Sequence, residues 1–258
     1  MTVGEWKKAG GADAVWILEE VLSLPRSRIF LEAERVLWEG ELSRLNAAKA
    51  RREAGEPVQY IFRRAPFMGY EFYVDERVLI PRMDTEVLCE AASHYIQNRK
   101  KSAVLDLCAG SGAIGLSLKR MHPEILLTLS DVSADAGDVQ RINAGRLDAE
   151  ILTGDLFAPV AGWAFDLIAC NPPYVRAGDI PNLSPEVRRE PLAALEGGAD
   201  GLDFYRRIAR SFRAHLTPGG RIYLEVGLGQ ADDVLALLGG GSAIHDLNGV
   251  KRVVWTEV

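Results

Sequence analysis

Long apolar runs are absent from the sequence of 258 residues, and this absence bounds what the protein can be. No stretch approaches the roughly 20 consecutive apolar residues that a membrane-spanning helix needs. The first residues, MTVGEWKKAGGADAVW, also lack the apolar core and the cleavage site of a secretory signal peptide. We therefore expect a soluble, globular protein of the cytoplasm, with no membrane partner.

Cysteine and histidine are both scarce. Cys89, Cys108 and Cys170 are odd in number and lack the spacing of metal ligands, so we expect reduced thiols rather than disulfides or a zinc site. The four histidines share no spacing with one another. The sequence thus predicts no bound metal, and it assigns no histidine to catalysis.

A surplus of positive charge is also missing. The formal net charge is -6 at pH 7, whereas proteins that bind nucleic acid over a broad surface are commonly basic. This balance disfavours a direct nucleic-acid partner, although a local basic patch would be compatible with it.

What the sequence does have is enough apolar material for a sizeable core. Hydrophobic residues make up 48% of the chain, which suits one large domain or a large and a small one. Over residues 12–54 apolar side chains recur at helical spacing, which predicts a small helical bundle. We expect a break at Gly40 and an end near Gly55 and Pro57. Residues 1–64 are therefore assigned to a helical domain.

The next segment, residues 65–82, reads APFMGYEFYVDERVLIPR. Apolar and aromatic residues lie on both sides of Asp75-Glu76, and those that follow are Val78, Leu79 and Ile80. This pattern predicts a β-hairpin that turns at Asp75-Glu76 and links two domains.

From residue 103 the pattern changes to short apolar strands that alternate with helical stretches. The strand segments include AVLDL, ILLTLSD, EILT and FDLIAC. Such alternation predicts βαβ units and a parallel sheet. Two later apolar runs surround Asn248-Gly249, a pair favoured in tight hairpins, so we expect the sheet to end in an antiparallel pair. Residues 83–258 thus read as an α/β domain.

A glycine-rich loop follows the first of these strands. The segment VLDLCAGSGAIG places Gly110, Gly112 and Gly115 in a G-x-G-x-x-G spacing, and Asp131 follows about 20 residues later. Read alone, this is a weak match to a dinucleotide site, and a tight strand-to-helix turn that needs glycine for packing would explain it equally well.

Acidic residues at strand ends help to choose the ligand. Asp106 at the mouth of the loop would repel a pyrophosphate, yet it suits the ammonium and sulfonium charges of S-adenosylmethionine. Asp131 can accept from ribose hydroxyls. Asp155 can accept from an adenine amino group, with Leu156 and Phe157 beside the ring.

Each acid taken singly is better explained as a helix cap or a solvated turn. Ligands of open α/β sheets bind where strands end, however, and the joint position of the three acids favours S-adenosylmethionine. The expected cofactor contacts are Asp106, Cys108, Ala109, Gly110, Ser111, Gly112, Asp131, Asp155, Leu156, Phe157 and Asn171.

The tetrapeptide Asn171-Pro172-Pro173-Tyr174 follows the strand FDLIAC. The side-chain carbonyl of Asn171 and the backbone carbonyl of Pro172 can together accept both hydrogens of a planar NH2 group, while Tyr174 covers its flat face. Acceptors so placed help most as positive charge grows on nitrogen during methyl transfer. Alone, the tetrapeptide would be read as a capped Pro-Pro turn. Behind the glycine loop it predicts catalytic roles for Asn171, Pro172 and Tyr174, and substrate binding by all four residues.

The sequence resembles the PrmC/HemK family, the N5-glutamine methyltransferases of peptide chain release factors. The likeness runs over nearly the whole chain and includes GEPVQYI, FMGYEFYVDERVLIPRMDTE, VLDLCAGSGAIG, FDLIACNPPYV and EPLAALEGGADGLDFYRRI. It implies a class I, Rossmann-like methyltransferase domain with seven strands, behind a helical substrate-recognition domain. It also implies that Asn171 and Tyr174 grip the glutamine amide of a Gly-Gly-Gln motif in a release factor.

The chain departs from the family pattern at Phe62, Met83 and Cys108, where glycine, proline and glycine are usual. Cys108 would crowd the methionine end of the cofactor. Other functions stay open at this stage: a glutamine methyltransferase of ribosomal protein, an adenine-N6 methyltransferase of nucleic acid, or a cofactor-binding module that has lost catalysis. The intact tetrapeptide disfavours the last, and the acidic balance disfavours the nucleic-acid enzyme.

Overall fold

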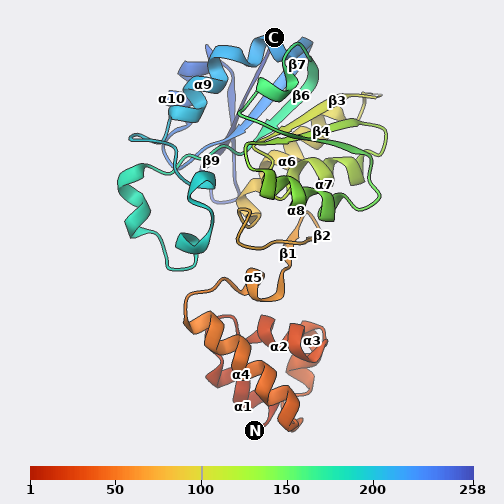
Figure 1. Ribbon diagram of the computed structural model, residues 1–258, viewed down its shortest axis with the longest axis vertical. Helices are drawn as coiled ribbons and strands as arrows, with labels where there is room; N and C mark the ends of the chain where they lie inside the picture. The colour runs from red at the N-terminus through yellow and green to blue at the C-terminus, as the bar shows by residue number, and fades with distance from the viewer. Residues whose placement is uncertain (100) are drawn as a thin grey trace. The chain divides into compact units, whose positions relative to one another are not determined.

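The computed structural model describes residues 1–99 and 101–258 and divides into two compact units (Figure 1). The first unit comprises residues 1–63 and 184–189, and the second comprises residues 64–183 and 190–258. A short segment from the second half of the chain thus packs with the amino-terminal unit, a feature that the sequence pattern does not predict.

The first unit is helical and has its own core. Trp6, Ile17, Leu18 and Leu45 are all buried in it. Its helices are α1 (Val3–Ala9), α2 (Ala14–Leu22), α3 (Arg26–Leu31), α4 (Glu39–Glu53) and α5 (Val58–Phe62).

The break expected at Gly40 lies several residues earlier, between α3 and α4. The Glu41 carboxylate accepts a hydrogen bond from the Trp38 backbone N–H at 3.2 Å, and this reach-back contact starts α4 ahead of the glycine. Gly40 therefore lies in the first turn of the helix, where any larger side chain would collide with the Trp38 ring.

Arg52 of α4 holds the segment 184–189 within the first unit. Its guanidinium pairs with Asp13 at 2.5 Å and with Glu186 at 2.6 Å. Arg189 donates to the Ala54 backbone carbonyl at 3.0 Å. Side chains of both parts of the first unit thus hold residues 184–189 in it.

A hairpin is present in the second unit, but its predicted turn was wrong. Strands β1 (Ala65–Phe67) and β2 (Tyr70–Phe72) pair in antiparallel register around Met68 and Gly69. These two residues have φ values of 51° and 74°, as a tight two-residue hairpin turn requires. Asp75 instead accepts from the Arg77 side chain at 2.6 Å, in a local turn without strands.

The second unit contains a seven-stranded sheet in the order β5-β4-β3-β6-β7-β9-β8, counted over the described residues. Neighbouring strands from β5 to β7 are parallel, whereas β9 is antiparallel to both β7 and β8. The α/β fold and the antiparallel final pair predicted from the sequence are confirmed. The strands are β3 (Ala103–Leu107), β4 (Leu126–Asp131), β5 (Ala149–Thr153), β6 (Phe165–Cys170), β7 (Leu216–Glu225), β8 (Ser242–His245) and β9 (Lys251–Glu257).

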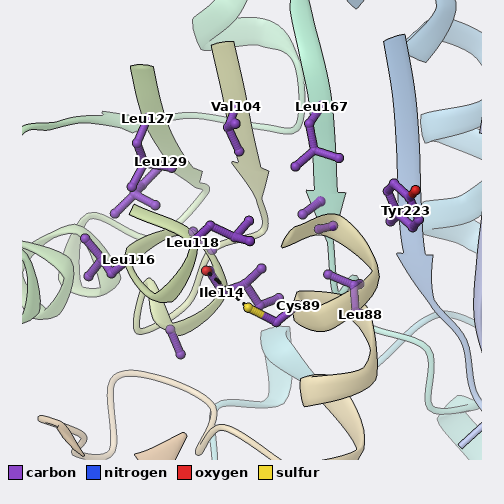
Figure 2. Packing of buried hydrophobic residues seen from close by; sticks show 14 of the residues in the cluster. Leu88, Cys89, Val104, Ile114, Leu116, Leu118, Leu127, Leu129, Leu167 and Tyr223 are labelled. Atoms are coloured by element: carbon purple, nitrogen blue, oxygen red, sulfur yellow. Dashed lines mark hydrogen bonds between the residues drawn. The ribbon is translucent and has the colours of Figure 1, made fainter. Parts of the chain in front are cut away.

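Helices cover both faces of this sheet. One core cluster contains Leu88 and Cys89 of α6 and Leu116 and Leu118 of α7, packed against strand residues such as Leu129 (Figure 2). A second cluster joins the other face to α9 and α10. The helices of this unit are α6 (Met83–Ile96), α7 (Ala113–Met121), α8 (Ala134–Ala144), α9 (Asp203–Ser211) and α10 (Ala231–Leu238), and short 3-10 turns span Ala158–Val160, Ala177–Asn182, Leu192–Ala194 and Phe212–His215.

The order of the strands in the sheet reverses between β3 and β6. From β3 the chain proceeds to β4 and β5 on one side, and it then returns to β6 and β7 on the other. Ligands of open α/β sheets bind at such a reversal. Within the described residues, no helix is long and apolar enough to cross a membrane, and no cluster of candidate metal ligands is present.

Candidate active site

The glycine loop joins β3 to α7 and has one open position. Gly110 and Gly112 have φ values of 53° and 77°, which side chains rarely adopt. A Cβ atom at Gly110 would meet no atom within 4 Å, so a ligand has room beside this residue. A Cβ atom at Gly115 would lie 2.6 Å from Leu129 Cδ2, and this third glycine is therefore explained by helix–strand packing alone.

Ala109 and Ser111 flank the open position, and both are buried. The Ala109 backbone N–H donates to the Ser130 carbonyl at 3.0 Å, and the Ser111 carbonyl accepts from Asn143 at 2.9 Å. These hydrogen bonds hold the loop in place on either side of Gly110.

Asp106 lies beneath the loop rather than at its mouth. Its carboxyl group is fully buried, and Oδ2 accepts from the Gly115 backbone N–H at 2.8 Å. Oδ1 is also buried and has no partner among the described residues. Burial raises the pKa of Asp106 to about 8. An unpaired buried acceptor next to an open loop suits the cationic methionine end of S-adenosylmethionine, so the residues present fit this cofactor.

Asp131 at the end of β4 ties the loop to the sheet. Its Oδ2 accepts from the Gly110 backbone N–H at 2.8 Å, and Oδ1 accepts from the Ser133 N–H at 2.9 Å. Burial raises the pKa of this carboxyl group. The structure thus brings Asp106, Asp131 and the glycine loop together, and contact of Asp131 with a ribose stays a prediction.

Asp155, Leu156 and Phe157 follow β5, and their contact with adenine stays a prediction. The Asp155 carboxylate pairs with Arg207 of α9, and its side chain is 57% exposed. The Phe157 ring stacks on His215 with centroids 4.5 Å apart, so one of its faces is already covered. Leu156 has a φ of 46°, an unusual value for a branched residue. No contact of the described residues joins Asp155 to the glycine loop.

Asn171 follows β6 at the same sheet edge as the loop, since Cys170 pairs with Leu107 of β3. The Asn171 Nδ2 donates to the Thr85 hydroxyl of α6 at 3.4 Å. The opposite end of the amide, Oδ1, is the acceptor that the sequence assigns to a substrate NH2 group.

Tyr174 is anchored at both its ring and its backbone. The hydroxyl donates to Glu225 Oε1 at 3.2 Å, and the carbonyl accepts from Gln230 at 3.1 Å. Pro172 and Pro173 are buried. A Cβ atom at Gly197 would lie 2.8 Å from the Pro173 carbonyl oxygen, so this carbonyl packs against the chain rather than facing a ligand.

Thr85 and Glu225 are site residues that the sequence analysis did not single out. Both stand in segments that carry the family resemblance, PRMDTE and RIYLEV. Their spacing along the chain carries no signal, because only the fold brings α6 and β7 to the tetrapeptide.

Cys108 occupies a backbone position that favours glycine. Its φ is 59°, which matches the glycine usual in the resembling family. Burial raises the pKa of the Cys170 thiol well above its usual value, and the neighbouring Cys108 raises it further. Both thiols are free, as the cysteine count predicts.

Glu190 fixes the segment that leads into α6. Its buried carboxylate accepts from the Ile80 backbone N–H at 2.9 Å and also pairs with Arg82. Burial raises the pKa of Glu190. This contact stabilises the start of α6, where Thr85 faces the Asn171 amide.

Comparisons with known proteins agree with the resemblance. Residues 84–190 match the methyltransferase small domain, and residues 9–62 match the PrmC N-terminal domain. A release factor glutamine methyltransferase of Geobacter sulfurreducens is 39% identical over 247 residues, which are 93% of this chain and 86% of that protein. One from Bordetella pertussis is 42% identical over 79% of this chain and 78% of its own length.

A solved structure shows the same fold. It is a 16S rRNA methyltransferase of T. thermophilus in complex with AdoMet and guanosine, with a TM-score of 0.56 and 21% identity, covering 75% of this chain and 49% of that one. At this identity the likeness concerns the fold alone. The matched methyltransferase domain and the relatives place the second unit among S-adenosylmethionine-dependent methyltransferases. The chain belongs to the family of release factor glutamine methyltransferases.

Proposed function

We propose that the protein transfers a methyl group from S-adenosylmethionine to the side-chain amide nitrogen of the glutamine in the Gly-Gly-Gln motif of a peptide chain release factor. The observation that carries this proposal is the orientation of Asn171. Its Nδ2 is engaged by Thr85, which leaves Oδ1 as an acceptor for an NH2 group. Family membership supports the choice of a glutamine amide over an adenine amine.

The cofactor supplies an electrophilic methyl group when bound. Gly110 offers the open position for it, Asp131 lies beside Gly110, and the free Oδ1 of Asp106 accepts from a cationic group. We assign the ribose to Asp131 and the methionine end to the Asp106 side of the loop.

The tetrapeptide binds and orients the amide. Asn171 Oδ1 and the Pro172 carbonyl accept its two hydrogens, and the Tyr174 ring covers its face. An amide nitrogen is a weak nucleophile, because its lone pair is delocalised into the carbonyl group. As its bond to carbon forms, positive charge grows on nitrogen, and two fixed acceptors stabilise that charge. The nitrogen then loses one proton to solvent, so no base needs to act before the attack.

We assign recognition of the folded release factor to the helical unit, in accord with the match of residues 9–62 to the PrmC N-terminal domain. A glutamine peptide presents little surface, whereas a folded partner presents enough to hold one loop in place. The intact factor should therefore be methylated with a kcat/KM at least about 100-fold above that of a Gly-Gly-Gln peptide. Equal values for the two substrates would remove this role from the helical unit. Because release factors act in the cytoplasm, we also assign the enzyme to that compartment.

The decisive experiment is incubation with labelled S-adenosylmethionine and purified release factors, followed by mass-spectrometric mapping of the modified residue. Methylation should appear at the glutamine of the Gly-Gly-Gln motif and should be absent from a factor in which that glutamine is alanine. Ribosomal proteins and adenine-containing DNA serve as parallel substrates. Methyl groups found on either of them, with the release factor unmodified, would contradict the proposal.

A further inference from the structure

We propose that Gln140 and Asn143 of α8 are positioning residues, which hold the glycine loop in the shape that S-adenosylmethionine binds. The two side chains lie three residues apart, about one helical turn, and both are buried. Neither needs to touch the cofactor. The inference rests on the part of the proposed function that places the cofactor beside Gly110, and it is independent of which protein is methylated.

The two carboxamides bind consecutive carbonyl groups of the loop. Gln140 Nε2 donates to the Gly110 carbonyl at 3.1 Å, and Asn143 Nδ2 donates to the Ser111 carbonyl at 2.9 Å. Asp131 at the end of β4 accepts from the Gly110 N–H. Both main-chain polar groups of Gly110 and the carbonyl of the next residue are thus tied to side chains of other elements.

The loop has a physical need for such restraints. Gly110 and Gly112 both have positive φ values, and glycine can leave such a conformation for many others because it has no side chain to restrict it. The Gly112 N–H closes a turn on the Ala109 carbonyl at 2.7 Å. Side chains that fix the residues within this turn order the loop before the cofactor arrives. Binding then does not have to supply the cost of ordering, and affinity increases.

The burial of Gln140 indicates a role beyond packing. The side chain is fully buried, and its Oε1 has no partner among the described residues. A buried acceptor without a partner destabilises a fold. An apolar side chain of similar length would fill the same space without that cost. The amide of Gln140 is therefore explained by its hydrogen bond to the loop.

Asn143 differs because it also supports a second segment. Its Oδ1 accepts from the Tyr73 N–H at 2.7 Å, and Nδ2 donates to the Tyr73 carbonyl at 3.0 Å. Tyr73 directly follows strand β2 of the hairpin. Asn143 thus contributes to the fold and to the loop, whereas the one hydrogen bond found for Gln140 among the described residues goes to the loop.

Gln140→Met separates loop positioning from fold stability. We expect the Kd for S-adenosylmethionine, measured by calorimetric titration, to rise about tenfold because the loop must be ordered on binding. The melting temperature of the cofactor-free protein should stay within about 2 °C of wild type or increase, since the substitution also removes the unpaired Oε1. A side chain that only packs α8 against the sheet would give no such separation.

Arg141→Met is the matched control on the same helix. Its side chain is exposed and pairs with Asp138, so neither the Kd nor the melting temperature should change appreciably. Asn143→Ala should weaken cofactor binding about tenfold as well, and it should also lower the melting temperature, because two main-chain groups of Tyr73 lose their partner.

Hydrogen exchange followed by NMR observes the loop directly, without a variant that has to fold. In the cofactor-free wild type, the Gly110 and Gly112 amides should be protected from exchange. In Gln140→Met their protection should fall at least about tenfold, with strand amides of the sheet unchanged, and added S-adenosylmethionine should restore it.

Two outcomes would overturn the inference. One is a Gln140→Met protein that binds S-adenosylmethionine with the wild-type Kd, and the other is a cofactor-free wild type whose Gly110 and Gly112 amides exchange as fast as those of an unfolded chain. A wild-type protein that does not bind S-adenosylmethionine would overturn the proposed function and the inference with it. A wild type that binds the cofactor but leaves release factors unmodified would overturn only the proposed substrate.

Discussion

The two halves of the candidate active site are held in different ways. In the cofactor half, Asp106 and Asp131 accept hydrogen bonds from backbone N–H groups of the glycine loop and its helix. In the amide half, Asn171 and Tyr174 are held by the side chains of Thr85 and Glu225, which come from other elements. Backbone contacts fix a shape that many side chains tolerate, whereas the side-chain contacts depend on each partner's identity. We therefore expect substitutions in the amide half to affect chemistry, and those in the cofactor half to affect affinity.

Asn171→Ala should give the largest effect on turnover and the clearest separation of the two halves. Loss of Oδ1 removes one of two acceptors for the charge that develops on nitrogen, so methyl transfer should fall about 10²- to 10³-fold. Cofactor affinity should change less than about threefold, because the carboxylates that border the loop lie on β3 and β4. Single-turnover assays and calorimetric titration measure the two quantities. A variant that retains near wild-type transfer would remove Asn171 from the catalytic role.

Asp131→Ala should have the opposite effects: cofactor affinity should fall, and methyl transfer should be largely retained. We expect S-adenosylmethionine binding to weaken by roughly 1.5–3 kcal/mol, the range for hydrogen bonds to a charged group, with little change in kcat at saturating cofactor. Asp131 also holds the Gly110 N–H, so Asp131→Asn is the matched control that keeps one acceptor for the loop. If the alanine variant binds with wild-type affinity, the ribose contact lies elsewhere.

The raised pKa of Asp106 predicts that cofactor binding releases a proton. Its pKa of about 8 means that the free protein holds it mainly protonated at pH 7. A bound cation would lower that pKa, so binding should release up to about one proton, and affinity should rise with pH up to about 8. Calorimetry in buffers of different ionisation enthalpy measures the released proton. Asp106→Asn should abolish the release, and an unaltered proton count in that variant would assign the effect to another group.

Titration of Asp106 should also change the stability of the folded protein. Stability should fall as pH rises, whereas cofactor affinity should increase. The pKa of Asp106 is raised from 3.8 to about 8 on folding, so the folded protein binds this proton more tightly than the unfolded chain does. The contribution of Asp106 to the free energy of unfolding is therefore highest below about pH 4 and falls as pH rises toward 8. In thermal unfolding without cofactor, Asp106→Asn should lose this part of the pH dependence.

Much of the cofactor half could be predicted from the sequence, because it is built from contiguous residues. The segment VLDLCAGSGAIG contains a strand, a loop and a helix start in one run. The depth of Asp106 could not be predicted, since it depends on which face of β3 packs against α7. The hairpin turn was misplaced because Met68-Gly69 and Asp75-Glu76 both have turn character, and only the pairing of Phe67 with Tyr70 decides between them.

The contacts of the amide half could not be predicted from the sequence. Thr85, Asn171 and Glu225 lie far apart along the chain, and each is an ordinary residue in its own segment. Only the parallel pairing of β6 with β7 and the packing of α6 on the sheet bring them together. The inclusion of residues 184–189 in the helical unit is equally invisible, since it rests on charged contacts such as that between Arg52 and Glu186.

Asp155 should give the smallest effect, and it tests how far the cofactor half extends. Its side chain is 57% exposed and pairs with Arg207, and exposed ion pairs contribute only about 0–1 kcal/mol. If Asp155 accepts from the adenine amino group, Asp155→Ala should weaken binding of S-adenosylhomocysteine by about 0.5–1.5 kcal/mol. Binding of S-inosylhomocysteine, which lacks that amino group, should be unaffected. Arg207→Ala is the control: it leaves the carboxylate free of its partner, so affinity should stay the same or increase slightly. An equal loss for both ligands in Asp155→Ala would mean that the residue only shapes the turn after β5, and that the cofactor half ends at Asp131.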